Sequence, residues 1–315
     1  MLTNKRIVLT GITGQVGGSL AAGLAPHNEV FGLARYTKPG ASEAVEALGV
    51  HPVRCDYTTG DFSGVPPDVD YVIHVAADTD PVTLDIGIEQ NAVGTGRLFH
   101  HLRDAKAWFY TSTTGVYWDH PDDQYAYKEG DRCGGSTRVT TRFHYGTTKF
   151  AGEAVAQTLS VIHDVPLVIA RLNWSYGKAG YGGLPGAMIG AILAEQPIDV
   201  HRDWKNMGSP IHEDDLVRTL EPLLDAATVG GLVVNWAGDE AISTVDLAEF
   251  IGAAIGIEPK FETVTTARSY PRITDNTRRR EICGPCTVPW REGVRRMIAE
   301  RHPELTLQPA PEVSA

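Results

Sequence analysis

A cluster of glycines near the start of the chain restricts its fold more than any other feature. The segment Thr10–Gly18, TGITGQVGG, stands between a short apolar run rich in β-branched residues and a helical pattern. In such a strand–loop–helix unit, Gly11 permits a tight turn, Gly14 lets a pyrophosphate approach the backbone, and Gly17 brings the helix close to the sheet. The pyrophosphate then meets free N–H groups at the helix N-terminus. The sequence therefore predicts a dinucleotide-binding loop.

The N-terminal half alternates strand and helix patterns. Strands are predicted over residues 5–10, 29–34, 51–55, 70–75, 107–111 and 166–170, and helices over 15–25, 42–48, 85–105 and 143–163. This alternation favours a parallel, doubly wound sheet with right-handed crossovers. We therefore expect an α/β fold of the Rossmann type.

After residue 176 the pattern loosens, and glycine and proline become dense. Helices are predicted over residues 187–194, 213–226, 244–254 and 290–300, with one strand over 231–235. We expect a dinucleotide-binding domain over residues 1–176 and a smaller, mainly substrate-binding portion over 177–315. The strand at 231–235 can rejoin the main sheet.

The end of the second predicted strand bears on the choice of cofactor. An NAD enzyme usually has an acidic residue there for the ribose hydroxyls, whereas an arginine accommodates the 2′-phosphate of NADP. This chain has Arg35, with Lys38 beyond it, and no carboxylate. The planar guanidinium of Arg35 can pair with a phosphate, although it can also stack on the adenine or stand exposed. We expect NADP as the cofactor, with NAD less favoured.

Further motifs, taken in order, resemble the extended short-chain dehydrogenase/reductase family, also called the NAD(P)-dependent epimerase/dehydratase family. They are Cys55-Asp56, His74-Val-Ala76-Ala77, Asn91-Ala-Val-Gly94-Thr95, Thr111-Ser-Thr113-Thr114-Gly115-Val-Tyr117, Tyr145-Gly-Thr-Thr-Lys149, Arg171-Leu-Asn173-Trp-Ser-Tyr176-Gly177 and Ile211-His212-Glu-Asp-Asp215. The resemblance covers most of the chain. It implies cofactor contacts from Gly11, Thr13, Gly14, Gln15, Val16, Gly17, Arg35, Lys38, Asp56, Tyr57, Val75, Ala76, Ala77, Asn91, Tyr145, Lys149, Leu172 and Asn173.

Tyr145 and Lys149 carry the chemistry. They lie four residues apart on a predicted helix and so share one face. A free tyrosine has a pKa of about 10, and a nearby ammonium favours its phenolate form. Tyr145 can therefore give or take a proton while a hydride moves at the nicotinamide. The resemblance implies that Lys149 holds the nicotinamide ribose and that Thr113 hydrogen-bonds the substrate oxygen. Substrate contacts are expected from Thr113, Thr114, Asn173 and Trp204.

Two departures from the family narrow the reaction. Dehydratases of the family place an acid after the catalytic threonine, but Thr114 and Gly115 stand here, so we do not expect 4,6-dehydration. Nucleotide-sugar enzymes usually carry an arginine just before the Ile211–Asp215 motif that binds the diphosphate. The matching position is Gly208, with Arg202 or Lys205 as nearby substitutes.

We therefore expect an NADP(H)-dependent oxidoreductase that reduces a carbonyl, or oxidises an alcohol, of a sugar-like or secondary-metabolite substrate. The alternative is a nucleotide-sugar 4-epimerase that keeps its cofactor tightly bound. A non-catalytic dinucleotide-binding regulator ranks third, because such proteins commonly lose the tyrosine or the lysine and this chain has both Tyr145 and Lys149.

Charge and hydropathy limit the partners. The formal net charge is -11, which should repel nucleic acid and anionic membranes. The densest basic run, Arg278–Arg280, is expected on a solvated face. No stretch reaches the ~18 consecutive apolar residues of a membrane span, and the start lacks a signal-peptide pattern, so we expect a cytoplasmic protein. The lone Cys283-Gly-Pro-Cys286 is not expected to bind metal, since a zinc site needs about four ligands. The resemblance implies a homodimer in which the helices over 85–105 and 143–163 form a four-helix bundle.

Overall fold

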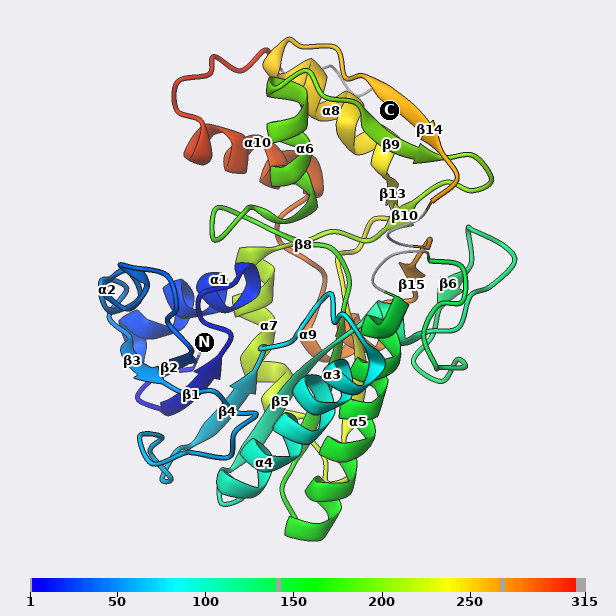
Figure 1. Ribbon diagram of the computed structural model, residues 1–315. Helices are drawn as coiled ribbons and strands as arrows, with labels where there is room; N and C mark the ends of the chain where they lie inside the picture. Colours follow the sequence, from blue (N-terminus) through cyan, green and yellow to red (C-terminus); the bar gives the residue numbers. More distant parts are fainter. Residues whose placement is uncertain (1, 140–142, 267–269, 310–315) are drawn as a thin grey trace.

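A seven-stranded parallel sheet lies at the centre of the computed structural model, which describes residues 2–139, 143–266 and 270–309 (Figure 1). The strand order is β12-β7-β5-β4-β1-β2-β3. The strands are β1 (Arg6–Thr10), β2 (Glu29–Ala34), β3 (His51–Arg54), β4 (Tyr71–His74), β5 (Ala107–Thr113), β7 (Leu167–Leu172) and β12 (Leu232–Trp236). All six strand pairs are parallel, which confirms the predicted Rossmann-type fold.

The sheet is buried on both faces because its strands are apolar at successive positions. Side chains of a strand alternate between the two faces, and in β1 Leu9 joins one core cluster while Val8 joins the other. The first face is covered by α1 (Gln15–Leu24) and α7 (Glu213–Asp225), which contact each other. The second is covered by α4 (Gly94–His101) and α5 (Phe143–His163). Smaller helices are α2 (Ala41–Glu46) and α3 (Leu84–Ile88).

The last strand of the sheet comes from the second half of the chain. β12 pairs in parallel with β7, from Leu232 opposite Val168 to Trp236 opposite Leu172. The strand predicted over 231–235 therefore does rejoin the main sheet. α7 precedes it and buries Leu216, Leu220 and Leu223 against the same core as Leu9. The dinucleotide-binding layer thus draws on residues well beyond 176.

The remaining elements lie above the carboxyl ends of the sheet strands (Figure 1). Three helices, α6 (Gly183–Leu193), α8 (Thr244–Ile255) and α10 (Trp290–Arg301), enclose a separate apolar core. Pairs of short strands connect them. These are β9 (Ile198–His201) with β14 (Phe261–Val264), β10 (Met207–Gly208) with β13 (Ile242–Ser243), β8 (Ser175–Tyr176) with β11 (Ile211–His212), and β6 (Ala126–Tyr127) with β15 (Ile273–Thr274).

The helix predicted over 85–105 is broken. α3 passes into a π-helical turn at Glu89–Val93 before α4 begins, and α4 ends at His101. Asn91 lies in this turn, and its buried amide bonds to both backbone groups of Asp78 and to Thr148 of α5. A side chain held in this way can account for the bulge in the helical ladder.

A second difference concerns the basic run 278–280. It forms α9 (Thr277–Cys283), and Arg279 is fully buried with an ion pair to Asp239. The expectation of a solvated face is wrong for this residue. Arg278 and Arg280 are exposed, as expected, and the sequence alone did not indicate that Arg279 between them is buried with an acidic partner.

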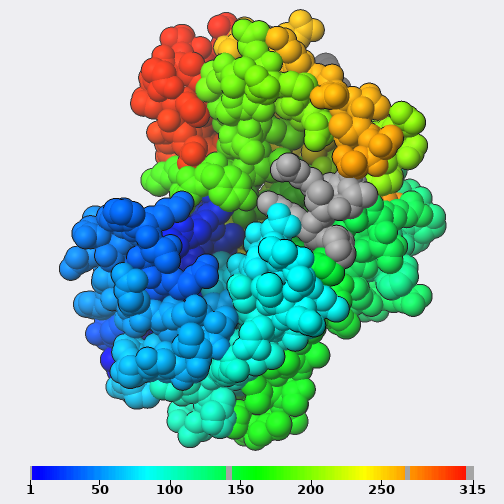
Figure 2. Space-filling view, viewed as in Figure 1, coloured from blue at the N-terminus to red at the C-terminus, as the bar shows by residue number. Residues whose placement is uncertain are grey.

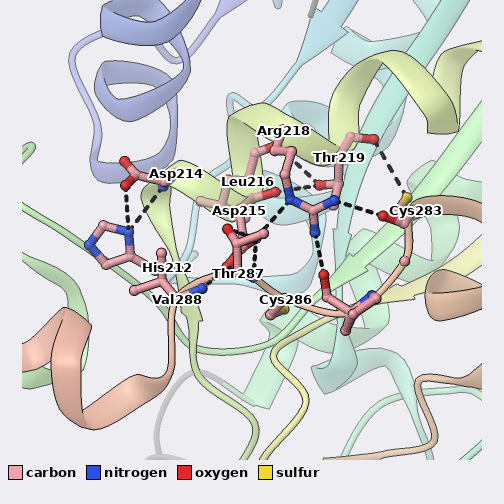
Figure 3. Close-up of polar contacts among 12 residues, drawn as sticks. His212, Asp214, Asp215, Leu216, Arg218, Thr219, Cys283, Cys286, Thr287 and Val288 are labelled. Atoms are coloured by element: carbon pink, nitrogen blue, oxygen red, sulfur yellow. Dashed lines mark hydrogen bonds and ion pairs between the residues drawn. The ribbon is translucent and has the colours of Figure 1, made fainter.

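The Ile211–Asp215 motif joins α7 to the C-terminal segment (Figure 3). The buried carboxylate of Asp215 accepts bonds from the Thr287 and Val288 N–H groups, and Arg218 donates to the Cys283 and Pro285 carbonyls. Burial raises the pKa of the Cys283 thiol to about 11 and that of Cys286 to about 12. In the parts of the chain that the structure describes, no helix is long and apolar enough to cross a membrane.

Candidate functional site

A cavity of about 750 Å³ opens at the carboxyl ends of β1, β4, β5 and β7. In Figure 2 the surface is hollowed where the blue N-terminal segments meet the yellow-green part above them. Most of the residues predicted to contact cofactor or substrate line this cavity. They are Gly11, Thr13, Gly14, Gln15, Val16, Gly17, Arg35, Asp56, Tyr57, Val75, Ala76, Ala77, Thr113, Thr114, Tyr145, Leu172 and Asn173.

The glycine loop has the geometry that its motif predicts. Gly11 has a φ of +68°, a left-handed conformation, and a Cβ there would lie 2.8 Å from the Ala76 nitrogen. A Cβ on Gly17 would lie 2.2 Å from the Gly11 carbonyl oxygen. A side chain at either position would collide with backbone, so the close approach of α1 to the loop depends on both glycines.

The N-terminus of α1 is suited to an anion. Gly14 precedes its first residue and offers no side-chain cap, and the first turn holds no acidic residue. Its leading N–H groups therefore lack a side-chain partner from the cap and lie at the cavity. A pyrophosphate would satisfy them.

Tyr145 and Lys149 both come from the first turns of α5. Tyr145 lines the cavity, while Lys149 is buried one turn further along. Among the described residues the Lys149 Nζ has no hydrogen-bond partner, and it lies 4.0 Å from the centroid of the Tyr110 ring. Burial lowers the pKa of Lys149 to about 7, against the opposing effect of Glu153. An unpartnered buried amine is costly, so the site fits a ligand with hydroxyl acceptors, such as a cofactor ribose.

Thr113 stands at the end of β5. Its Oγ1 accepts a hydrogen bond of 3.1 Å from the Gly115 N–H and thereby begins the short turn Thr114–Val116. A threonine hydroxyl that accepts one bond still has its proton to donate. Thr113 is therefore held at the cavity with a donor available for a substrate oxygen.

His74 supports the site from the core. It is fully buried between Thr10 and Thr95, with its two ring nitrogens 2.8 Å and 3.0 Å from their hydroxyl oxygens. Burial and the charge of Lys149 lower the pKa of His74 to about 3, so the ring is neutral. The Thr10 hydroxyl also accepts from the Val75 and Ala76 N–H groups, which fixes the backbone beneath the cavity.

Four predicted contact residues lie outside the cavity lining. Lys38 is exposed, and Lys149 is buried behind the lining as described above. Asn91 is buried and committed to Asp78 and Thr148. Trp204 stacks on His201 at 3.4 Å between ring centroids. Their ligand contacts therefore stay predictions.

The amide of Asn173 lines the cavity but is occupied by protein groups. Its Nδ2 donates to the Arg272 carbonyl at 2.6 Å, and its Oδ1 accepts from the N–H groups of Trp174 and Ser209. Asn173 therefore organises this wall of the cavity, and its predicted ligand contact is not tested.

Sequence reasoning missed Arg272. This buried residue lines the cavity, and its five N–H donors are all engaged by protein acceptors. The acceptors are the carbonyls of Thr114, Tyr117 and Pro271, the Tyr127 hydroxyl and the Asp119 carboxylate. In the described chain around Arg272, the nearest element is the two-residue strand β15, which is too short to give a periodic signal.

Trp174, also missed, explains the departure at Gly208. A Cβ on Gly208 would lie 2.4–2.7 Å from three atoms of the Trp174 indole, so that ring lies against the bare backbone of Gly208. The position where related enzymes carry an arginine is therefore filled by the indole. Arg202 and Lys205 are exposed and lie outside the cavity lining.

The fold and this arrangement define an enzyme of the extended short-chain dehydrogenase/reductase class. A glycine loop before α1 and a Tyr145–Lys149 pair on α5 meet at one cavity. The profile of the NAD dependent epimerase/dehydratase family matches residues 7–235, and the chain belongs to this family. No curated protein matches the chain.

Solved structures of similar shape include sugar-nucleotide enzymes. UDP-glucuronic acid 4-epimerase from Bacillus cereus has a TM-score of 0.80 and 20% identity, over 95% of this chain and 99% of that one. dTDP-glucose 4,6-dehydratase from Bacillus anthracis has a TM-score of 0.79 and 17% identity, over 95% of this chain and 97% of that one. UDP-N-acetylglucosamine 4-epimerase from Methanobrevibacter ruminantium has a TM-score of 0.79 and 17% identity, over 96% of this chain and 99% of that one. At this identity the likeness shows a shared fold.

Proposed function

We propose that the protein is an NADP(H)-dependent oxidoreductase that reduces a carbonyl, or oxidises the matching alcohol, of a small molecule. The observation that carries this proposal is the meeting of Tyr145 and Thr113 with the glycine loop at one cavity, above the unpartnered amine of Lys149. These are the groups that a hydride transfer with coupled proton transfer needs.

The cofactor, when bound, supplies the hydride at its nicotinamide ring. Gly11, Gly14 and Gly17 would hold its pyrophosphate through backbone, and Lys149 would hold the nicotinamide ribose. Thr113 donates a hydrogen bond to the carbonyl oxygen and so orients it. Tyr145 gives its hydroxyl proton to that oxygen as the alcohol forms, and it takes the proton back in the reverse direction.

Dehydration is not supported. Thr114 is buried, and its carbonyl accepts from Arg272, while Gly115 has no side chain. Neither residue can act as the base that removes a proton beside a ketone.

Charge favours simple reduction over sugar-nucleotide chemistry. Among the described residues, the cations that line the cavity are Arg35 at the end of β2 and Arg272. The guanidinium of Arg272 is fully engaged and is paired with Asp119 at 2.7 Å. Arg35 is the residue proposed to bind the cofactor, so a substrate diphosphate would find no other uncommitted arginine or lysine in the described lining, and an unpaired phosphate in a cavity is poorly solvated.

A nucleotide-sugar 4-epimerase is the second candidate, because the two 4-epimerases described above match this chain over 95% and 96% of its length. Those proteins include one solved with UDP-glucuronic acid and NAD. An epimerase returns its hydride to the same substrate and keeps the dinucleotide bound, so stoichiometric oxidation of added NADPH separates the two functions.

Tyr145→Phe tests the proton donor. We expect turnover of NADPH with a carbonyl substrate to fall by ~10²–10⁴-fold, because the variant has no proton to give. The Kd for NADPH should stay within about twofold, since the ring remains. Tyr71→Phe, which removes the hydroxyl of a tyrosine outside the cavity lining, is the control. Unchanged turnover in Tyr145→Phe would place the donor elsewhere.

A further inference from the structure

We propose that the substrate subsite of this cavity takes an uncharged aromatic ring, carried by a ketone or the matching alcohol, and not a phosphate-bearing group. The proposal rests on the hydride transfer proposed above and names its substrate class. The side chains that bound this subsite, called here the aromatic wall, are Val139, Trp174, Tyr181, Leu184 and Tyr270.

Trp174 gives the wall a flat and fixed surface. The chain leaves β7 at Leu172, and the Trp174 N–H bonds to the Asn173 amide at 2.8 Å. The indole is backed by Gly208, where a Cβ would come within 2.4 Å of the ring. Since no side chain fits between them, one face of the indole is packed, and the partly buried ring lines the cavity.

Tyr270 offers its ring and not its hydroxyl. That hydroxyl donates to the His120 carbonyl at 2.8 Å and accepts from Arg138 Nη1 at 3.0 Å. Tyr270 is only 4% exposed, and its ring contacts Trp204, with 5.1 Å between the ring centroids. Trp204 therefore supports the wall from behind. The guanidinium carbons of Arg138 and Arg272 lie 5.1 Å and 5.2 Å from the centroid of the Tyr270 ring.

The charged groups that line this part of the cavity are unfavourable for an anion. Arg272 is the guanidinium in the lining here, and all its donors are used within the protein. Arg138, which lies 5.1 Å from the centroid of the Tyr270 ring and bonds to its hydroxyl, stands outside the lining. Asp119, its ion partner, is itself bonded to Ser136 and Thr137. A phosphate would have to break these bonds, whereas an apolar ring needs none of them and gains from contact with aromatic faces.

In the reaction, the carbonyl carbon of an aryl ketone gains the hydride of NADPH, and its oxygen gains the Tyr145 proton. The products are the aryl alcohol and NADP⁺, and Tyr145 recovers its proton from solvent. No further reactant is needed.

A matched set of ketones tests the proposal. We expect acetophenone to be reduced with a kcat/KM at least tenfold higher than 4-acetylbenzoate, because the added carboxylate has no cation to meet. UDP-glucose should not bind at millimolar concentration. Equal rates for acetophenone and 4-acetylbenzoate would overturn the aromatic subsite and leave the proposed reduction standing.

The variant Trp174→Ala tests whether the aromatic wall is what binds acetophenone. Trp174→Ala should raise the KM for acetophenone about tenfold and leave the KM for acetone and the Kd for NADPH within about twofold. Trp118→Ala removes another partly exposed tryptophan, which stacks on Arg132 outside the cavity lining, and should change none of these values. An equal loss for acetone and acetophenone in Trp174→Ala would contradict the proposal.

Calorimetry of acetophenone binding to the protein saturated with NADP⁺ needs no turnover. Binding that Trp174→Ala weakens supports the subsite even if no ketone is reduced, in which case the proposed reaction alone is wrong. Tight binding of UDP-glucose in place of acetophenone overturns the subsite and favours the epimerase.

Discussion

At the residue scale, the chemistry of the site depends on two cations in opposite settings. Arg35 is exposed at the end of β2 and lines the cavity, whereas Lys149 is buried without a hydrogen-bond partner. Both residues stand in motifs and were predicted from the sequence. Arg272 and Trp174 were not, because what they do depends on Asp119, Tyr127 and Gly208, which lie far from them in the sequence.

Arg35 is expected to select NADP over NAD. The similar 4-epimerase and 4,6-dehydratase were solved with NAD, so the preference for NADP rests on this guanidinium. In Arg35→Asp the Kd for NADPH should rise ~100-fold, because a 2′-phosphate would face a carboxylate, and the Kd for NADH should change less than about threefold. Fluorescence titration measures both. Arg103→Asp makes the same charge change at an exposed arginine outside the cavity lining and serves as control. Equal losses for both dinucleotides would remove this role from Arg35.

Lys149 is expected to make stability depend on pH. Its pKa is lowered from 10.5 to about 7, so between these values the unfolded chain holds a proton that the folded chain has released. The free energy of unfolding then rises with pH across that window, by at most ~1.4 kcal/mol per pH unit. Lys149→Met lacks this dependence. Between pH 7 and 9, the free energy of unfolding of the wild-type protein should therefore rise by about 1–3 kcal/mol more than that of Lys149→Met.

Urea unfolding of the dinucleotide-free protein at pH 7, 8 and 9 measures the difference. Lys178→Met, at an exposed lysine, should follow the wild type. If Lys149→Met and wild type ran parallel with pH, the buried amine would keep its proton through the whole range.

At the scale of elements, length and apolar periodicity decided what could be predicted. α5 was predicted at its observed bounds, because its pattern runs over many turns. The two-residue strands carry no period and were missed; they are β6, β8, β10, β11, β13 and β15. The π-turn at Glu89–Val93 was missed because it depends on the contacts of Asn91 with Asp78 and with Thr148 of α5.

We propose that α5, with α3 and α4, forms a dimer interface. Val161 and Ile162 of α5 are 62% and 65% exposed, and Leu84 and Ile86 of α3 are 42% exposed each. Such apolar helix surfaces favour burial against a second copy. Light scattering should give the mass of a dimer for the wild type and of a monomer for Val161→Asp/Ile162→Asp. Leu48→Asp, at an exposed apolar residue between α2 and β3 and away from these helices, should stay dimeric. A monomeric wild type would refute the interface.

At the scale of the molecule, the two portions are interwoven. The sheet lacks its edge strand until β12, and α7 supplies core residues to the same layer. The predicted boundary at residue 176 marks where the alternating strand and helix pattern ends. The sheet is complete only at β12, which ends at Trp236. The sequence pattern predicted the strand near 231–235 but not that it pairs with β7. The pairing of strands far apart in the sequence produces no pattern within either strand.

A chain cut after residue 176 tests the consequence. It would expose the β7 edge that β12 covers and the apolar surface beneath Leu216, Leu220 and Leu223. We expect residues 1–176 to aggregate, since an open edge strand beside apolar surface pairs readily with other chains. A cut after 309 removes only residues outside the described part and is the control. A soluble 1–176 fragment with cooperative unfolding would show that this domain folds alone.

The bonds of Arg272 also determine when, during translation, the wall of the cavity can form. The Arg272 guanidinium bonds to the carbonyl of Thr114, 158 positions earlier, beside the threonine that we expect to bind substrate. At translation rates of roughly 5–20 residues per second, the turn after β5 therefore waits on the order of 10–30 s for this contact. Throughout that interval the nascent chain carries the glycine loop, and in its later part also Tyr145, but it lacks Arg272, which lines the cavity. The protein could therefore carry out the proposed reaction only once translation is nearly complete.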